Sequence, residues 1–196
     1  MVKYFIAALL ISVACTQVTN KKTSANKEIE AIEFPVTDTL TLLFGGDAMQ
    51  HLPQINSART DTGYDYTSCL APVKNIISQA DISIINFETT LGDKPYTGYP
   101  QFSSPDEFAK ALKECGFDIF LTANNHCLDR YTHGAQRTLN QLDSLSIPHI
   151  GTYRNSLERQ HNYPMLKTVN NIHIAFLNYT YGTNGISPQA PFIVNL

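Results

Sequence analysis

The sequence predicts an α/β protein built on parallel strands, and three observations lead to that fold class. Three short apolar runs each end in a cluster of polar side chains, the segments between them have helical spacing, and a late pair of apolar runs flanks Asn170-Asn171. Strands that alternate with helices form parallel sheets, whereas a two-residue turn that tolerates positive φ joins antiparallel strands. We therefore expect parallel strands first and an antiparallel hairpin late in the sequence.

Local patterns place the individual elements. We expect strands at 39–44, 82–86, 117–122, 148–150, 165–169 and 172–179, helices at 69–80, 105–116 and 133–145, and a loop over 51–67. The first strand is almost fully apolar, which predicts a buried position. The second helix has the clearest limits, because Pro105 suits a first helical position and Gly116 suits a helix end.

Length and composition indicate one globular domain. The 196 residues are enough to bury a proper core, and an apolar content of 43% with a charged content of 16% is typical of a folded protein. The formal net charge of −3 provides no basic surface, so we expect no nucleic-acid partner.

The first residues predict a lipoprotein signal peptide over 1–15. Lys3 supplies a positive start, Tyr4–Ala14 form an apolar run too short to span a bilayer, and a small residue directly precedes Cys15. This pattern resembles a bacterial lipobox, so we expect lipidation at Cys15 and a membrane anchor at the cell envelope. An ordinary cleaved signal with an incidental cysteine is the alternative.

Residues 16–38 are polar and rich in Lys, Thr and Asn, a composition that predicts a flexible linker ahead of a folded domain over 39–196. That domain contains Cys69, Cys115 and Cys127 without any C-x-x-C spacing, which argues against a zinc–thiolate site. One disulfide would be compatible with an exported protein, but we expect buried thiols.

Three polar clusters stand directly after the predicted parallel strands. They are Gly45-Gly46-Asp47, Asn86-Phe87-Glu88 and Asn124-Asn125-His126. The carboxyl ends of parallel strands meet at one edge of a sheet, and neighbouring strands lie about 4.8 Å apart. We therefore expect Asp47, Glu88, Asn125 and His126 to converge, and oxygen and imidazole ligands together describe a divalent-metal site.

Each candidate also has a purely structural alternative. Asp47 suits a turn that bonds its own backbone, Glu88 suits a solvated loop, and Asn86 suits a loop that needs its backbone groups satisfied. His126 titrates near neutrality, which suits proton transfer or metal binding. Asp129 would either orient His126, as carboxylates that hydrogen-bond a metal-binding histidine often do, or cap the next helix.

The clusters extend into longer blocks that resemble a known family. The blocks Leu43–Met49 (LFGGDAM), Ile85–Leu91 (INFETTL) and Leu121–Asp129 (LTANNHCLD) appear in order. They are similar to the signature blocks of the CapA capsule-synthesis (poly-γ-glutamate) proteins, and the resemblance covers about residues 39–180. The segment Phe108–Asp118 also resembles the helix and strand that precede the third block.

The resemblance implies a metallophosphoesterase-like α/β sandwich, since that family is related to the calcineurin-like enzymes. It implies a divalent metal (Mn, Fe or Zn) with Asp47 as a ligand and Glu88 as a ligand or catalytic base. By the same resemblance, Asn125 binds the metal or a substrate oxygen and His126 is the general acid. Asn86 and Asn124 are the expected substrate-binding residues.

The resemblance is restricted to the N-terminal part of the family domain. Relatives carry later His-Trp-Gly and Gly-His-x-His blocks, whereas this sequence contains no tryptophan. We therefore expect a domain truncated at its C-terminus, with weak or absent catalysis by this chain alone.

The leading functional hypothesis is a CapA-type capsule biosynthesis protein, a metal-dependent hydrolase at the bacterial cell envelope. Its expected partners are a capsule or envelope polymer and other capsule-assembly proteins. The residues do not distinguish a phosphoester, a peptide or a γ-glutamyl amide as the bond cleaved. The alternatives are a non-catalytic envelope lipoprotein that binds a polymer or partner, and a plain metallophosphoesterase.

Overall fold

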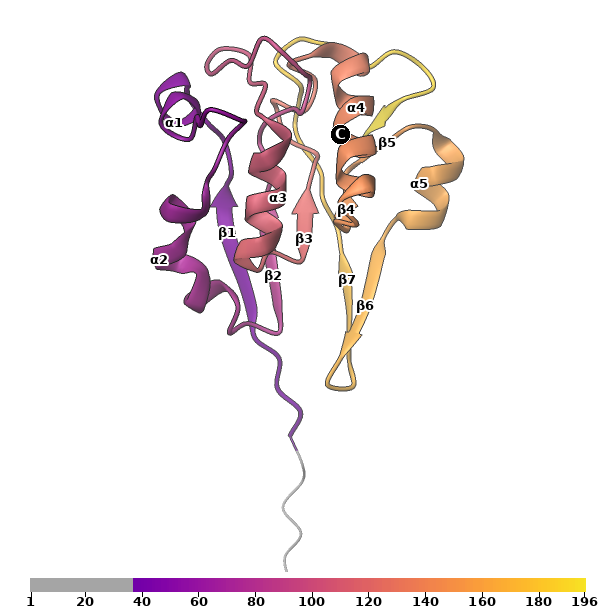
Figure 1. The fold of residues 1–196 in the computed structure, drawn as a ribbon. Coiled ribbons are helices and arrows are strands. Elements are labelled where there is room, and N and C mark those ends of the chain that lie inside the picture. The colour runs from indigo at the N-terminus through magenta and orange to yellow at the C-terminus, as the bar shows by residue number, and fades with distance from the viewer. Residues whose placement is uncertain (1–36) are drawn as a thin grey trace, which may run out of the picture. The chain divides into compact units, whose positions relative to one another are not determined.

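Four parallel strands form the central sheet of the protein, whose computed structural model describes residues 37–196. They are β1 (Leu42–Asp47), β2 (Ile82–Asn86), β3 (Ile119–Leu121) and β4 (His149–Ile150), and they lie side by side in that order (Figure 1). Each pairs with the next in parallel, so their carboxyl ends meet at one edge. The predicted α/β class with parallel strands first is confirmed.

Helices cover one face of this sheet. They are α2 (Thr67–Ile77), α3 (Asp106–Cys115) and α4 (Tyr131–Ser144). Helix α1 (Leu52–Ser57) follows β1, and α5 (Ser156–Asn162) contacts β5 (Thr152–Tyr153) and has no buried residue. The main core lies between the sheet and α2, α3 and α4, where Phe108 and Leu112 of α3 pack with Phe120 of β3. Helix α3 ends as predicted, because Gly116 adopts a left-handed conformation with φ of 118°.

An antiparallel hairpin covers the other face. It consists of β6 (Met165–Val169) and β7 (Ile172–Phe176), and the Asn170-Asn171 turn has φ values of 50° and 61°, as the sequence predicts. The hairpin packs Phe176 against a row of buried isoleucines from β2, β3 and β4. A second small sheet pairs β5 (Thr152–Tyr153) with β8 (Ile193–Val194). Helices, sheet and hairpin together form an incomplete α/β sandwich.

The expected burial of the first strand is wrong. Strand β1 is the edge of the sheet, and Leu42 and Phe44 remain 38% and 64% exposed. They share a sheet face with Ile82 and Ile84 of β2, but those two residues are covered by the hairpin and the β1 residues are not. An apolar run predicts a strand, while burial depends on what neighbours it.

The apolar face predicted for the helix at 69–80 is also only partly buried. Ile77 is buried, but Val73 and Ile76 are 41% and 63% exposed. They line an open groove of about 440 Å³ between α2 and the β1 edge. Helix α2 therefore packs against α3 and leaves a groove open beside the outermost strand.

Several short elements arise where the sequence predicts loop or strand alone. Helix α1 lies inside the segment expected to be loop, and α5 precedes the hairpin. Cys115 and Cys127 are buried free thiols as expected, whereas Cys69 is exposed. No helix within residues 37–196 is long and apolar enough to cross a membrane. The predicted signal peptide, Cys15 and nearly all of the predicted linker lie outside the described residues.

Candidate functional site

The polar clusters meet because β1, β2 and β3 end at the same edge of the sheet. Asp47, the last residue of β1, pairs with Asn86, the last residue of β2, across a bulge that begins after Phe44. Gly46 lies in this bulge with φ of 76°, where a side chain would be strained. Gly45 is required for space, because a Cβ atom there would come within 2.6 Å of the Phe117 ring.

Asn124 fixes the orientation of the amides in the site. Its Oδ1 accepts a hydrogen bond from the His126 backbone N–H at 3.1 Å, and its Nδ2 donates to the Phe87 carbonyl at 3.0 Å. A backbone N–H can only donate and a carbonyl can only accept, so this amide has one orientation. The same Nδ2 donates to Asn86 Oδ1 at 3.2 Å. Asn86 must therefore turn its own Nδ2 the other way.

Asn86 joins the two carboxylates of the site. Its Nδ2 donates to Asp47 Oδ1 at 2.8 Å and to Glu88 Oε2 at 3.2 Å. Asp47 is exposed, whereas the Glu88 side chain is only 10% exposed. Burial raises the pKa of Glu88 above its ordinary value, and the charge of Asp47 raises it further, while His126 opposes the shift. Glu88 is thus a buried acid with few partners for its charge.

His126 is held by a second buried acid. Its Nδ1 lies 2.7 Å from Asp129 Oδ2, and the two side chains are 10% and 1% exposed. Asp129 also accepts the Phe102 backbone N–H at 2.6 Å, and the Phe102 ring packs edge-on against the imidazole. Burial raises the pKa of Asp129, although these two hydrogen bonds oppose the shift. The other ring nitrogen, Nε2, lies 4.0 Å from Glu88 Oε1.

The structure brings most of the predicted residues into one network. Its members are Asp47, Asn86, Glu88, Asn124, His126 and Asp129. Asn125 is placed differently, because its Nδ2 faces Asn184 Oδ1 at 3.4 Å rather than the carboxylates. The chemical roles of these residues stay predictions, but their convergence is a property of the fold.

Sequence reasoning missed residues that support the site from distant segments. Asn178 donates to the Ala123 carbonyl and accepts the Ala123 N–H, which fixes the start of the loop after β3. Asn184 brings its Nδ2 to 3.3 Å from His126 Nδ1. Asn184 precedes a glycine and has φ of 51°, so in the sequence it looks like any turn asparagine.

The donor types at the site suit a divalent cation. Two carboxylates and an imidazole are common ligands of Mn, Fe and Zn, and the buried Glu88 carboxylate accepts only the Asn86 hydrogen bond among the contacts described. The carboxylates and the imidazole are, however, farther apart than the ligands of a bound metal ion. Within residues 37–196, no three His, Cys, Asp or Glu side chains stand close enough together to hold a metal ion as arranged. Asp47 and Glu88 would need to turn from Asn86 to share one.

Comparison with known proteins identifies the family. Residues 41–193 match the family described as bacterial capsule synthesis protein PGA_cap. The chain belongs to this family. The match begins at β1 and ends at β8, so it includes every strand of the described fold.

Individual relatives agree with the family assignment. The capsule biosynthesis protein CapA of Bacillus anthracis is 23% identical over 184 residues, which cover 90% of this chain and 43% of the relative. The uncharacterized proteins y4sH and y4uA of Sinorhizobium fredii (strain NBRC 101917 / NGR234) are each 33% identical over 87 residues, or 40% of this chain and 19% of theirs. The matched residues thus span less than half the length of each of these relatives.

Proposed function

We propose that this capsule-synthesis family member provides part of the active site of a divalent-metal-dependent hydrolase that acts on a capsule or envelope polymer. The observation that carries the proposal is the network at the carboxyl edge of the sheet. In it, the Asn86 amide joins the two carboxylates, and an aspartate-held imidazole lies 4.0 Å from Glu88. Buried acids of this kind, with raised pKa values, are common at catalytic sites.

Asp47 and Glu88 are the residues that would hold the cation. Such an ion polarises a substrate oxygen and lowers the pKa of a bound water. Asn86 orients the carboxylates through its amide, and Asn124 fixes the orientation of Asn86. A substrate oxygen would accept one of these N–H groups by displacing its present acceptor. Asn125 faces Asn184, so we assign it to the rim of the site rather than to the ligands.

His126 would move the proton. Asp129 accepts the Nδ1 proton and so fixes the orientation of the ring. Nε2 then faces the centre of the site, close to Glu88, where it can deliver a proton to the leaving group. A phosphoester, a peptide and a γ-glutamyl amide all release a group that needs this proton.

One observation favours a second candidate, a non-catalytic protein that binds a polymer or an assembly partner. The Asn86 amide, oriented by Asn124, donates to both carboxylates and so takes the place a cation would need. A site that stays in this arrangement would offer hydrogen bonds to a ligand but would not take up a metal.

Metal uptake distinguishes the two candidates. The purified 196-residue protein is loaded with Mn, Fe or Zn, desalted and analysed for bound metal, beside Asp47→Asn and Glu88→Gln. We expect about one tightly bound ion per chain. Both substitutions should abolish this binding. The control Asp61→Asn, which replaces an exposed loop acid, should bind the ion as the unaltered protein does. Equal uptake by all four proteins, or none by the unaltered protein, would overturn the hydrolase proposal.

Because we expect weak or absent catalysis by this chain alone, turnover is then tested in an active full-length relative. Three substrates are used under the same metal conditions: a generic phosphodiester, a peptide and a γ-glutamyl amide. Cleavage of the phosphodiester alone would favour a plain metallophosphoesterase. Loss of cleavage in His126→Ala, with metal still bound, would support the proton-donor role.

A further inference from the structure

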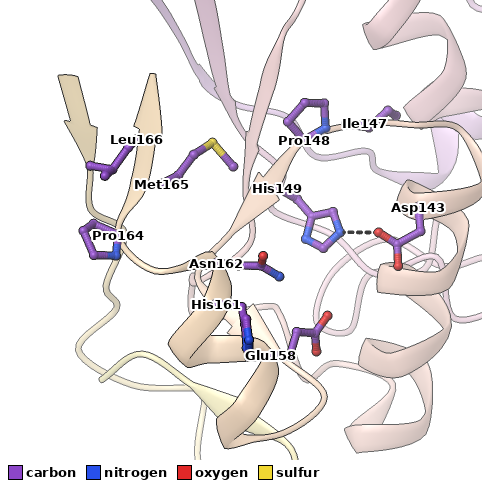
Figure 2. Close-up of a pocket in the computed structure, with 10 residues that line it drawn as sticks. All are labelled: Asp143, Ile147, Pro148, His149, Glu158, His161, Asn162, Pro164, Met165 and Leu166. Atoms are coloured by element: carbon purple, nitrogen blue, oxygen red, sulfur yellow. Dashed lines mark hydrogen bonds and ion pairs between the residues drawn. The ribbon is translucent and has the colours of Figure 1, made fainter. Parts of the chain in front are cut away.

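A separate cavity lies beside β4, at the opposite edge of the sheet from β1, and it shares no residue with the candidate active site. Its volume is about 470 Å³, and it is lined by the end of α4, β4, the end of α5 and the start of β6 (Figure 2). Asp143, His149, Glu158, His161 and Asn162 supply its polar wall, and Pro164 and Met165 supply apolar contacts. A cavity of this size suits a small ligand.

His149 contributes a buried atom that has no partner. Its side chain is 10% exposed, and its Nε2 lies 3.0 Å from Asp143 Oδ1. Burial alone would raise the pKa of Asp143, but hydrogen bonds from His149 and Arg154 lower it below the ordinary value. Asp143 is therefore a carboxylate that accepts the Nε2 proton, and in the neutral ring Nδ1 carries a lone pair. This Nδ1 is buried and makes no hydrogen bond.

The rest of the polar wall also consists mainly of acceptors. The Nδ1 atom of His161 lies 2.7 Å from the Leu157 carbonyl, which can only accept, so the lone pair of the neutral His161 ring is on Nε2. Both carboxylate oxygens of Glu158 accept hydrogen bonds from Arg154, one from its guanidinium and one from its backbone N–H. Figure 2 shows His161 and Glu158 below the His149 ring, with the Asn162 carboxamide in the space between.

We propose that this cavity binds a hydroxyl-rich ring, such as one neutral sugar unit. Hydroxyl groups of the ligand would donate to His149 Nδ1 and His161 Nε2, and its C–H face would lie on Met165 and the adjoining proline. Because Nδ1 is buried, a neighbouring side chain must turn aside to admit the ligand, and we assign that movement to Asn162, which is exposed and lies beside the ring. Binding then supplies the hydrogen bond that Nδ1 lacks, which offsets the cost of burying it.

The test is a titration of the full chain, followed by NMR or calorimetry, with glucose, N-acetylglucosamine and glucuronate as probes. We expect saturable millimolar binding of the two neutral sugars and weaker binding of glucuronate, whose carboxylate would face Glu158 and the ring lone pairs. His149→Phe keeps a ring but removes Nδ1, and it should weaken binding about tenfold, the range for one lost hydrogen bond. His161→Ala, an exposed position, should weaken it about two- to tenfold.

Two controls make the result decisive. His173→Phe alters a histidine that bonds Thr168 on the exposed side of the hairpin, and it should leave the affinity unchanged. Asp47→Asn should also bind sugar normally, so failure of this proposal is separate from failure of the metal site. Binding unaffected by either cavity variant, no saturable binding, or a preference for glucuronate would overturn the proposal. If His149→Phe does not fold, His161→Ala decides the outcome.

Discussion

At the scale of single residues, Asn124 determines how the candidate site is arranged. Its amide is fixed by one backbone donor and one backbone acceptor, and it passes that orientation to Asn86. The sequence predicted the Asn-Asn-His cluster but assigned the metal-binding role to Asn125. Adjacent loop residues turn in different directions, and only the backbone partners of a loop decide which one enters the site.

Replacing Asn124 should therefore destabilise the fold, whereas replacing its neighbour should not. In Asn124→Ala the buried His126 N–H and Phe87 carbonyl lose their partner, at an expected cost of about 2–4 kcal/mol in the free energy of unfolding. Asn125→Ala removes one long contact to Asn184 and should cost less than about 0.5 kcal/mol. Urea unfolding followed by circular dichroism measures both, and similar losses in the two variants would contradict this account.

The ionised Glu88 carboxylate should lower the free energy of unfolding at neutral pH. Its pKa is raised in the folded state, so between its ordinary pKa and the raised one the folded protein binds more protons than the unfolded chain, and stability falls as pH rises through that window. In metal-free buffer, Glu88→Gln should therefore be more stable than the unaltered protein at pH 7, by about 1 kcal/mol. The difference should vanish below the ordinary pKa of a glutamate. A constant difference across that pH range would rule out titration as its cause.

At the scale of elements, local patterns predicted what forms and neighbours decided what is buried. The hairpin turn at Asn170-Asn171 and the end of α3 at Gly116 follow from the backbone preferences of those residues. The exposure of Phe44 could not be predicted in this way, because an apolar strand has the same sequence pattern whether or not another layer covers it. Elements of two residues, such as β5 and β8, lack a readable period and form only through their pairing.

The Gly-Gly bulge of β1 provides a test at this scale. Gly45→Ala places a methyl group within 2.6 Å of Phe117 and 2.8 Å of Ile85, so either β1 or the ends of these buried side chains must shift, at a cost of about 1–3 kcal/mol. Gly182→Ala is the matched control, because nothing lies within 4 Å of its added methyl group. Thermal unfolding should separate the two variants, and metal uptake should fall only in Gly45→Ala. Equal melting temperatures would show that the bulge tolerates a side chain.

At the scale of the whole molecule, the chain gathers the candidate site at one edge of its central sheet. It spans 43% of the length of the Bacillus anthracis CapA relative, and its described residues place two carboxylates, an imidazole and their supporting amides at one sheet edge. The sequence predicted this convergence because parallel strands share a carboxyl edge. The sequence did not indicate Asn178 and Asn184. Their partners at the site lie 55 and 58 residues earlier in the chain, and local patterns do not show that the chain returns there.

We expect the protein to be held at the cell envelope through Cys15. In a bacterial host, labelled fatty acid should attach to the unaltered protein and to Cys69→Ser, and both should sediment with membranes. Cys15→Ser should lose the label and the association, because a lipid chain supplies most of the membrane affinity of such a protein. Membrane association without Cys15 would show that another segment or partner holds it there.

One side of β1 is left uncovered by residues 37–196, and this affects how concentrated solutions of the protein behave. A sheet edge bordered by an exposed phenylalanine is a template on which any extended polypeptide can add a further strand. Natural proteins discourage such addition by placing a lysine or proline there, and the run Leu42–Phe44 contains neither. Turbidity of concentrated samples would therefore begin at this edge, and a single lysine in place of Phe44 is the substitution that would suppress it.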